Sequence, residues 1–216
     1  QGNAGDNSYH VVTGADSATL DGFTISGGNA SGNLQDGYGG GMYNDYINSP
    51  TVANCIFTGN YASLGGAMFN LGSSPTVTNC SFSGNTASSY GGGMYNTDAN
   101  PVLTNCTFSN NLSYGYGGGM VNGALSNPTL TNCTFRGNAA NISGGGMYNT
   151  HGNPSVKNCT FSGNSAGTSG GGMYNDNNSP VVRNSIFWGN SNGEISDTVS
   201  TPTVSDTVVQ GGYPGG

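Results

Sequence analysis

The chain has 216 residues, 40 of them glycine, and its 3 basic and 10 acidic side chains give a formal net charge of −7 at pH 7. So few basic residues, Arg136, Lys157 and Arg183, provide no stripe of positive charge for phosphates, so we expect no nucleic acid partner. No apolar run approaches the roughly 20 residues that a membrane-spanning helix needs, so we expect no membrane span. The chain begins at Gln1 without a visible signal peptide, which suggests a mature or excised sequence.

A unit of roughly 26 residues recurs along the chain. Its prolines, at positions 50, 75, 101, 128, 154 and 180, follow one another at steps of 25 to 27 residues. All 6 methionines keep the same spacing, each after a pair of glycines or Gly-Ala. A period that varies by only one residue indicates stacked structural units, one for each turn of a solenoid.

Each unit predicts three short strands and three bends. In the unit that starts at Pro75, Thr-Val-Thr alternates polar and apolar residues, and Cys-Ser-Phe after Asn79 does so again. A glycine-rich corner then leads into Gly-Met-Tyr-Asn, where adjacent Met94 and Tyr95 must point to opposite faces of an extended segment. Helical repeats are excluded, because no segment of ten or more residues shows a period of about 3.6.

Because every unit presents the same strand at the same place, we expect successive coils to pair in parallel and in register, about 4.8 Å apart. The predicted fold is an all-β, right-handed parallel β-helix of about eight coils of about 26 residues. We expect one domain over residues 1–216, with N-terminal coils in 1–44, five regular repeats in 45–178 and C-terminal coils in 179–216.

Like residues should form inward ladders along the axis, whose burial stabilises the tube. A valine or leucine at the first strand belongs to these ladders, together with methionine, cysteine and phenylalanine. The predicted ladder residues are Met42, Met68, Met94, Met120, Met147 and Met173; Cys55, Cys80, Cys106, Cys133 and Cys159; and Phe57, Phe82, Phe108, Phe135, Phe161 and Phe187.

The cysteines number 5, an odd count, and each lies at the same place in its unit. This pattern fits neither a disulfide framework nor the CxxC spacing of a metal site, so we predict that each thiol packs inside the tube. Adjacent coils would still bring neighbouring cysteine Cα atoms within disulfide range.

Two asparagine columns are predicted at bends, where left-handed backbone is tolerated and stacked amides can hydrogen-bond along the axis. They are Asn54, Asn79, Asn105, Asn132, Asn158 and Asn184, and Asn44, Asn70, Asn96, Asn122, Asn149 and Asn175.

The Gly-Gly-x-Met and Phe-x-Gly-Asn pieces of the coil resemble the paired GGA[ILV] and FxxN repeats of chlamydial polymorphic outer-membrane proteins. The whole chain is similar to secreted bacterial β-helix proteins of the choice-of-anchor Q type. The matching segments are HVVTGADSATLDGFTISGGNA (10–30), tandem coils such as SPTVTNCSFSGN (74–85), NSIFWGN (184–190) and VVQGGYPGG (208–216). The resemblance implies an extracellular or bacterial cell-surface location, and relatives usually continue beyond the position of Gly216 into an anchoring region.

An enzyme of polysaccharide chemistry would need clustered acids, with Arg or Lys nearby for a lyase. Asp45, Asp98 and Asp176 follow the methionine strand in three units but not in all neighbouring ones, and His10 and His151 lie in distant units. We therefore predict no enzyme and no catalytic, cofactor-binding or metal-binding residue.

Lys157 and Arg183 occupy one position on adjacent coils, where other coils carry Thr78, Thr104 and Thr131. The simplest interpretation of this pair is solvated surface.

The row after methionine is aromatic in most coils. If methionine faces inward, this row faces outward, and it then either binds sugars or a host protein or is covered by Gly/Tyr insertions such as those with Tyr114 and Tyr116. The candidate surface-contact stripe is Tyr43, Phe69, Tyr95, Tyr148 and Tyr174.

Neither end of the sequence predicts a capping helix, and both read as incomplete β coils. Open ends can satisfy one another across subunits, and a head-to-tail contact that does not close grows a fibre. The first functional prediction is thus a non-enzymatic extracellular structural protein that stacks head-to-tail with copies of itself. The alternatives are a cell-surface adhesin or carbohydrate-binding β-helix, with surface glycans or a host protein as partner, and third a polysaccharide lyase or hydrolase. No cofactor is expected.

Overall fold

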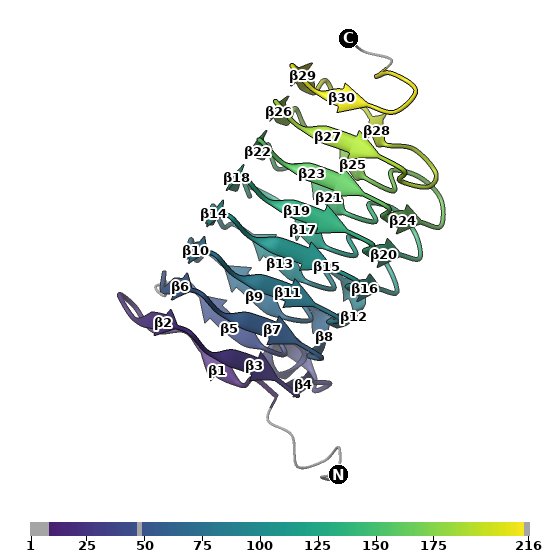
Figure 1. Ribbon diagram of the computed structural model, residues 1–216. Helices are drawn as coiled ribbons and strands as arrows, with labels where there is room; N and C mark the ends of the chain where they lie inside the picture. Colours follow the sequence, from purple (N-terminus) through teal and green to yellow (C-terminus); the bar gives the residue numbers. More distant parts are fainter. Residues whose placement is uncertain (1–8, 47–48, 214–216) are drawn as a thin grey trace.

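The computed structural model describes residues 9–46 and 49–213. The chain winds into a stack of coils, with the first coil at one end and the last at the other (Figure 1). Three parallel sheets of eight strands run the length of the stack, and a fourth has six strands. The prediction of an all-β parallel solenoid of about eight coils is therefore confirmed.

We name the sheets A to D in the order in which one coil visits them. Sheet A contains β1 (Val12–Thr13), β5 (Met42–Asp45), β9 (Met68–Leu71), β13 (Met94–Thr97), β17 (Met120–Asn122), β21 (Met147–Thr150), β25 (Met173–Asp176) and β28 (Ile195–Thr198). Sheet B contains β2 (Thr19–Asp21), β6 (Thr51–Ala53), β10 (Thr76–Thr78), β14 (Val102–Thr104), β18 (Thr129–Thr131), β22 (Ser155–Lys157), β26 (Val181–Arg183) and β29 (Thr203–Ser205).

Sheet C contains β3 (Thr24–Ser26), β7 (Ile56–Thr58), β11 (Ser81–Ser83), β15 (Thr107–Ser109), β19 (Thr134–Arg136), β23 (Thr160–Ser162), β27 (Ile186–Trp188) and β30 (Val208–Val209). Sheet D contains β4 (Asn29–Ala30), β8 (Tyr61–Leu64), β12 (Thr86–Tyr90), β16 (Leu112–Ser113), β20 (Ala139–Ala140) and β24 (Ser165–Ala166). A short 3-10 helix, η2 (Leu34–Gly37), lies in the connection between β4 and β5.

The repeat sets the register, because each strand pairs with the same strand of the next coil. Phe82 lies opposite Phe108 and Met94 opposite Met120. All the methionines, cysteines and phenylalanines predicted as ladders are buried in one core cluster. The Phe82 and Phe108 rings stack with centroids 4.5 Å apart and planes 4° from parallel, and this arrangement continues through the column from Phe57 to Phe187.

Smaller aliphatic residues take over these columns at both end coils. The methionine column ends at Val12 and Ile195, and the phenylalanine column ends at Ile25 and Val209. Of these four, only Ile25 is fully buried, and the others are partly exposed. The end coils therefore hold their inward side chains less tightly than the middle of the stack.

One asparagine column lies at bends as predicted. Asn54, Asn79 and their equivalents have φ between 47° and 55°. Their exposed amides bond along the axis, as where Asn105 Nδ2 donates to Asn79 Oδ1 over 3.1 Å. The column that contains Asn44 was predicted at bends too, and that part of the prediction is wrong. It lies inside the strands of sheet A, fully buried, because an amide that bonds to the coils above and below needs no water.

Sheet D was not predicted, since three strands per coil were expected. It follows the Phe-x-Gly-Asn bend, and its inward side chains are small, chiefly buried alanines such as Ala62, Ala87 and Ala140. The recurring Asn-x-Ala spacing, with serine in one coil, is the sequence signal for this strand. It is weak, because alanine alone does not distinguish a strand from a loop.

Candidate functional site

No acidic catalytic centre is evident in the described part of the chain. Among residues 9–46 and 49–213, no three His, Cys, Asp or Glu side chains come close enough to hold a metal ion together. His10 stacks on Tyr43 at the first coil, whereas His151 is exposed at a bend of a later coil, 2.9 Å from Thr150 Oγ1. The absence of enzymatic activity stays a prediction.

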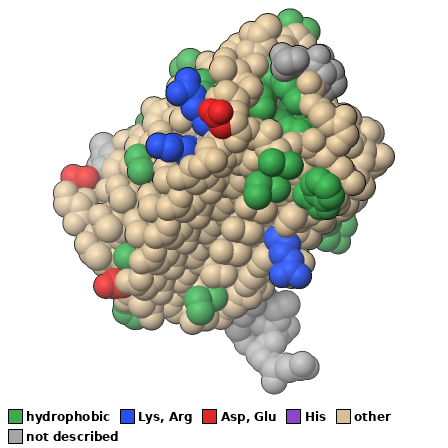
Figure 2. Space-filling model, turned by 45° about the horizontal axis from the view of Figure 1, so that its top comes forward, with side chains coloured by type: hydrophobic (Ala, Val, Ile, Leu, Met, Phe, Trp, Pro, Cys, Tyr) green, Lys and Arg blue, Asp and Glu red, His purple; other side chains and the backbone are tan. Residues whose placement is uncertain are grey.

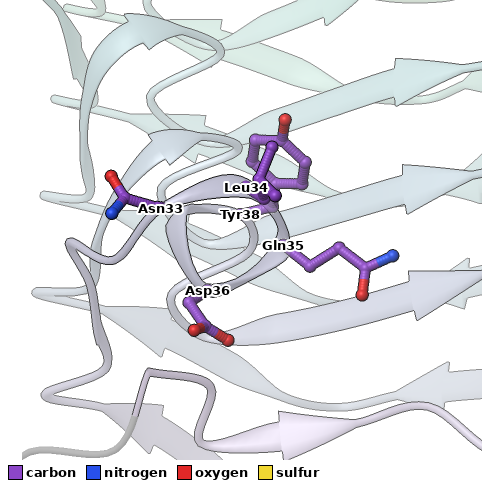
Figure 3. Close-up of a pocket in the computed structure, with 5 residues that line it drawn as sticks. All are labelled: Asn33, Leu34, Gln35, Asp36 and Tyr38. Carbon is purple, nitrogen blue, oxygen red and sulfur yellow. The ribbon is translucent and has the colours of Figure 1, made fainter.

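A hollow of about 540 Å³ lies beside η2 and is lined by Asn33, Leu34, Gln35, Asp36 and Tyr38. Its side chains point away from one another rather than towards a common point (Figure 3). Leu34 is 81% exposed, and Asp36 is the only carboxylate of the lining. This hollow offers no convergent set of groups for binding or chemistry.

The aromatic row that follows methionine is not a surface stripe. Tyr43, Phe69 and Tyr148 are buried, and Tyr95 and Tyr174 are half-buried. The rings stack along the axis, with centroids 5.4 Å apart for Phe69 and Tyr95 and again for Tyr148 and Tyr174. The prediction of an exposed contact stripe is therefore wrong for most of its members.

A second aromatic layer covers this row. Tyr38 stacks on Phe69 with centroids 4.7 Å apart, and Tyr116 packs against Tyr148 at the same distance. Burial, together with nearby Asp176, raises the pKa of Tyr148 to about 12. The segments between sheets D and A thus act as the covering insertions that were the alternative interpretation, and they cover most of the aromatic row.

The cysteine column does more than fill space. The described cysteines are all free thiols. Cys159 Sγ donates to Lys157 O over 3.2 Å and accepts a hydrogen bond from Cys133 N over 3.4 Å. In the next coil Ser185 replaces cysteine, and its Oγ donates to Arg183 O over 2.8 Å and accepts from Cys159 N. Each side chain thus satisfies polar backbone groups at the bend between sheets B and C.

Two of these thiols, Cys80 and Cys106, are poorly suited to redox or metal chemistry. Burial raises the pKa of the Cys80 thiol to about 11. The hydrogen bond with the Cys133 thiol and burial together raise the pKa of Cys106. Because the thiolate is the reactive form, these two thiols are inert near neutral pH.

A third asparagine column, which was not predicted, runs along the bend between sheets C and D. Asn111 Oδ1 accepts from both Asn85 N and Asn85 Nδ2 over 3.0 Å, and Asn111 Nδ2 donates to Asn138 Oδ1 and to Phe82 O. Its members are Asn60, Asn85, Asn111, Asn138, Asn164 and Asn190.

In each of the three asparagine columns every side-chain amide donates to the next one, and the last amide donates to a carboxylate. In the last coil Asp197 Oδ1 accepts from Asn175 Nδ2 over 2.7 Å, and Glu194 accepts from Asn190. The exposed column runs the other way and ends where Asn54 Nδ2 donates to Asp21 Oδ1 over 2.7 Å. A carboxylate accepts without donating, so it terminates a chain of amides that each donate in one direction.

The outer face of sheet C carries a cleft that sequence reasoning missed. Arg136, Ser162 and Trp188 follow one another across adjacent strands β19, β23 and β27. Together with Asn110 and glycines at the following bend they line a hollow of about 490 Å³. We call it the Arg136–Trp188 cleft.

The small Ser162 side chain leaves the middle of the cleft open. Trp188 is 56% exposed, and Arg136 is exposed as well. A side chain added at Gly163 would meet nothing within 4 Å, which shows how open this floor is. The sequence signal was present, since arginine and tryptophan stand where neighbouring coils carry the serines of β15 and β23.

Next to this cleft, on sheet B, Lys157 and Arg183 lie side by side in register on β22 and β26. Both are exposed and line a groove of about 240 Å³. In Figure 2 basic side chains gather at one place, with an acidic side chain beside them, and occur again near exposed hydrophobic side chains of the same face. The sequence predicted Lys157 and Arg183 as solvated surface, and it did not predict the groove that they line.

A stack of parallel coils with a covered sheet A and open outer faces on sheets B and C defines a β-solenoid protein. A family model described as right-handed β-helix region matches residues 6–153. The chain therefore belongs to the right-handed β-helix family, which agrees with the predicted hand. Among curated proteins and among solved structures, the searches found no match to this chain.

Within the described ranges, the structure contains no helix with the length and apolar character needed to cross a bilayer.

Proposed function

We propose that this protein is a non-catalytic β-helix that binds carbohydrate at the surface of a bacterium and presents the binding face on a rigid support. The Arg136–Trp188 cleft carries this proposal. The resemblance of the coils to secreted surface β-helices supports the extracellular location. A carbohydrate-binding β-helix was the second of the functional predictions from the sequence. That prediction put the binding site on the aromatic row of sheet A, whereas we now propose a site on sheet C.

The composition of the cleft suits a sugar. An exposed indole offers a flat apolar face for the C–H surface of a pyranose ring, and a guanidinium donates several hydrogen bonds to ring substituents. Arg136 and Trp188 flank Ser162 at a Cα separation of about 10 Å, two strand spacings apart. A single ring can therefore lie above Ser162 with one residue on either side.

Exposed apolar side chains extend the cleft along sheet C. Ile186 is 45% exposed and lies two residues before Trp188, so both point outward from β27. Val208, opposite Ile186 on β30, is 54% exposed. Three neighbouring exposed apolar side chains on one face favour an interaction site there.

Tryptophan fluorescence provides the test, because Trp188 is the only tryptophan in the chain. We expect a glycan identified on an array to shift the Trp188 emission. W188A contains no tryptophan, so its affinity is measured by calorimetry, and it should bind that glycan about tenfold more weakly through lost ring contact. Y114A, which removes a 54% exposed aromatic ring elsewhere, is the matched control and should bind normally. A panel of glycans that leaves the emission unchanged, or W188A with unchanged affinity, contradicts the proposal.

Head-to-tail self-association is a second proposal. The partly exposed aliphatic residues of the two end coils, Val12 and Leu20 at one end and Val204 at the other, favour it. The carboxylates of Glu194 and Asp197 oppose it, because they terminate the buried amide columns on one of the faces that would stack. Sedimentation over a hundredfold concentration range decides: growth in mass supports stacking, and a constant monomer mass excludes it.

A further inference from the structure

The Lys157–Arg183 pair points to a second subsite, and this inference rests on the proposed function. The chain has 3 basic residues in 216, and two of them face each other directly across neighbouring strands. Like charges at directly opposed positions of a sheet are destabilising. The corresponding positions of earlier coils carry Ala53, Thr78, Thr104 and Thr131, so the repeat itself does not require a charge here.

The surroundings leave this charge largely unbalanced. The strands of sheets B and C in three consecutive coils, over residues 129–136, 155–162 and 181–188, contain all 3 basic residues and no acidic one. In the next coil Asp206 follows Ser205, which pairs with Arg183, so one acidic residue lies close to the two positive charges of the pair. On a chain of net charge −7, this face is thus locally positive.

The groove gives the pair a shape that fits an oxyanion. Ser155, Val156 and Val181 line it together with the two basic residues. Lysine supplies a compact positive charge and arginine a planar fork of donors, so the two can hold the oxygens of one carboxylate or sulfate from two sides. No acid lies among the lining residues to compete for them.

The two subsites are close enough for one chain molecule to reach both. Lys157 and Ser162, the floor of the Arg136–Trp188 cleft, are five residues apart in the same coil, which limits their Cα separation to about 17 Å. That span corresponds to a few sugar units. We propose that Lys157 and Arg183 bind an oxyanion group, carboxylate or sulfate, of the same glycan whose sugar ring lies against Trp188.

A nucleic acid also carries oxyanions, but the observations favour a glycan. Nucleic acid binding depends on many phosphate contacts and on several stacked aromatic rings, whereas this face provides three cations and one indole. The acidic remainder of the chain would repel a long polyphosphate.

The experiment measures binding of dextran, dextran sulfate and hyaluronan to the whole chain by calorimetry and by Trp188 emission. We expect dextran sulfate or hyaluronan to bind at least tenfold more tightly than dextran. The variant K157Q/R183Q should lose that preference and most of the salt dependence. K157Q/R183Q lowers the net charge by two. The control is therefore T24D/T76D, which makes the same charge change at exposed threonines of other coils.

The outcomes separate the two proposals. If K157Q/R183Q keeps the preference, or if dextran binds as tightly as the charged polymers, the oxyanion subsite is excluded while carbohydrate binding at Trp188 stands. If an oligonucleotide of equal charge displaces the glycan at lower concentration, the assigned ligand class is wrong. If no polymer changes the Trp188 emission and none on the array does, the proposed function falls as well.

Discussion

The buried cysteines of this protein form hydrogen bonds with the backbone as well as packing in the core. The thiol at each bend between sheets B and C bonds to the carbonyl two residues earlier, as Cys80 Sγ does with Thr78 O over 3.2 Å. In the last two coils, hydroxyl groups take the same role, since Ser185 is followed by Thr207, whose Oγ1 donates to Ser205 O over 2.8 Å. The shared requirement is a small side chain that can both donate and accept.

This role predicts how Cys159 tolerates replacement. We expect C159S to cost less than about 1 kcal/mol of unfolding free energy, because the hydroxyl keeps both bonds. C159V, although more apolar, should cost about 2 kcal/mol or more, because Cys133 N loses its acceptor and Lys157 O keeps only the bond from Asn132 N. Urea unfolding followed by Trp188 emission measures both variants. A valine variant as stable as the parent would mean that packing alone fixes this position.

Sequence periodicity predicts whether a residue points into or out of the tube. It does not predict whether another segment covers a side chain that points outward. Met94 and Phe108 were predicted to be inward because each follows a period of about 26, and both are buried. Tyr148 was predicted to face out from sheet A, and it does, yet it is buried by a segment whose path depends on tertiary packing. Trp188 departs from the repeat, so periodicity does not identify it.

At the scale of one element, the glycine triplet sets how closely two coils approach. A Cβ at Gly118 would lie 2.4 Å from Ala139 O and 2.6 Å from Ala139 C, both backbone atoms of the next coil. The bend therefore needs a residue without a side chain, because the strands of sheets D and A must turn within one coil spacing. The four-sheet coil depends on this corner, which the sequence predicted only as a bend.

We predict that G118A costs about 3 kcal/mol or more of stability, because neither clashing atom can move without breaking the stack. G163A is the matched control: its φ of +61° disfavours alanine by about 1–2 kcal/mol, but its side chain would meet no atom within 4 Å. Thermal unfolding by circular dichroism compares the two. Equal melting temperatures would show that close approach does not matter at this corner.

The whole molecule combines a repetitive support with a local departure from the repeat. Coils with the same residues stack into sheets whose cores and amide columns run the length of the tube, and carboxylates end those columns. The period predicted the stacked coils, their register and the core columns of this support, because these depend on repetition, but it missed sheet D and the third asparagine column. The proposed binding depends on departures from the repeat such as Arg136, Arg183 and Trp188, which a period cannot locate in space.

A crystal structure of the protein with a bound acidic oligosaccharide tests the central claim most directly, since it shows where on the solenoid a ligand lies. We predict a sugar ring above Ser162 between Arg136 and Trp188, with a carboxylate or sulfate of the same ligand at Lys157 and Arg183. A ligand bound instead along sheet A, or at one end of the stack, would contradict the account.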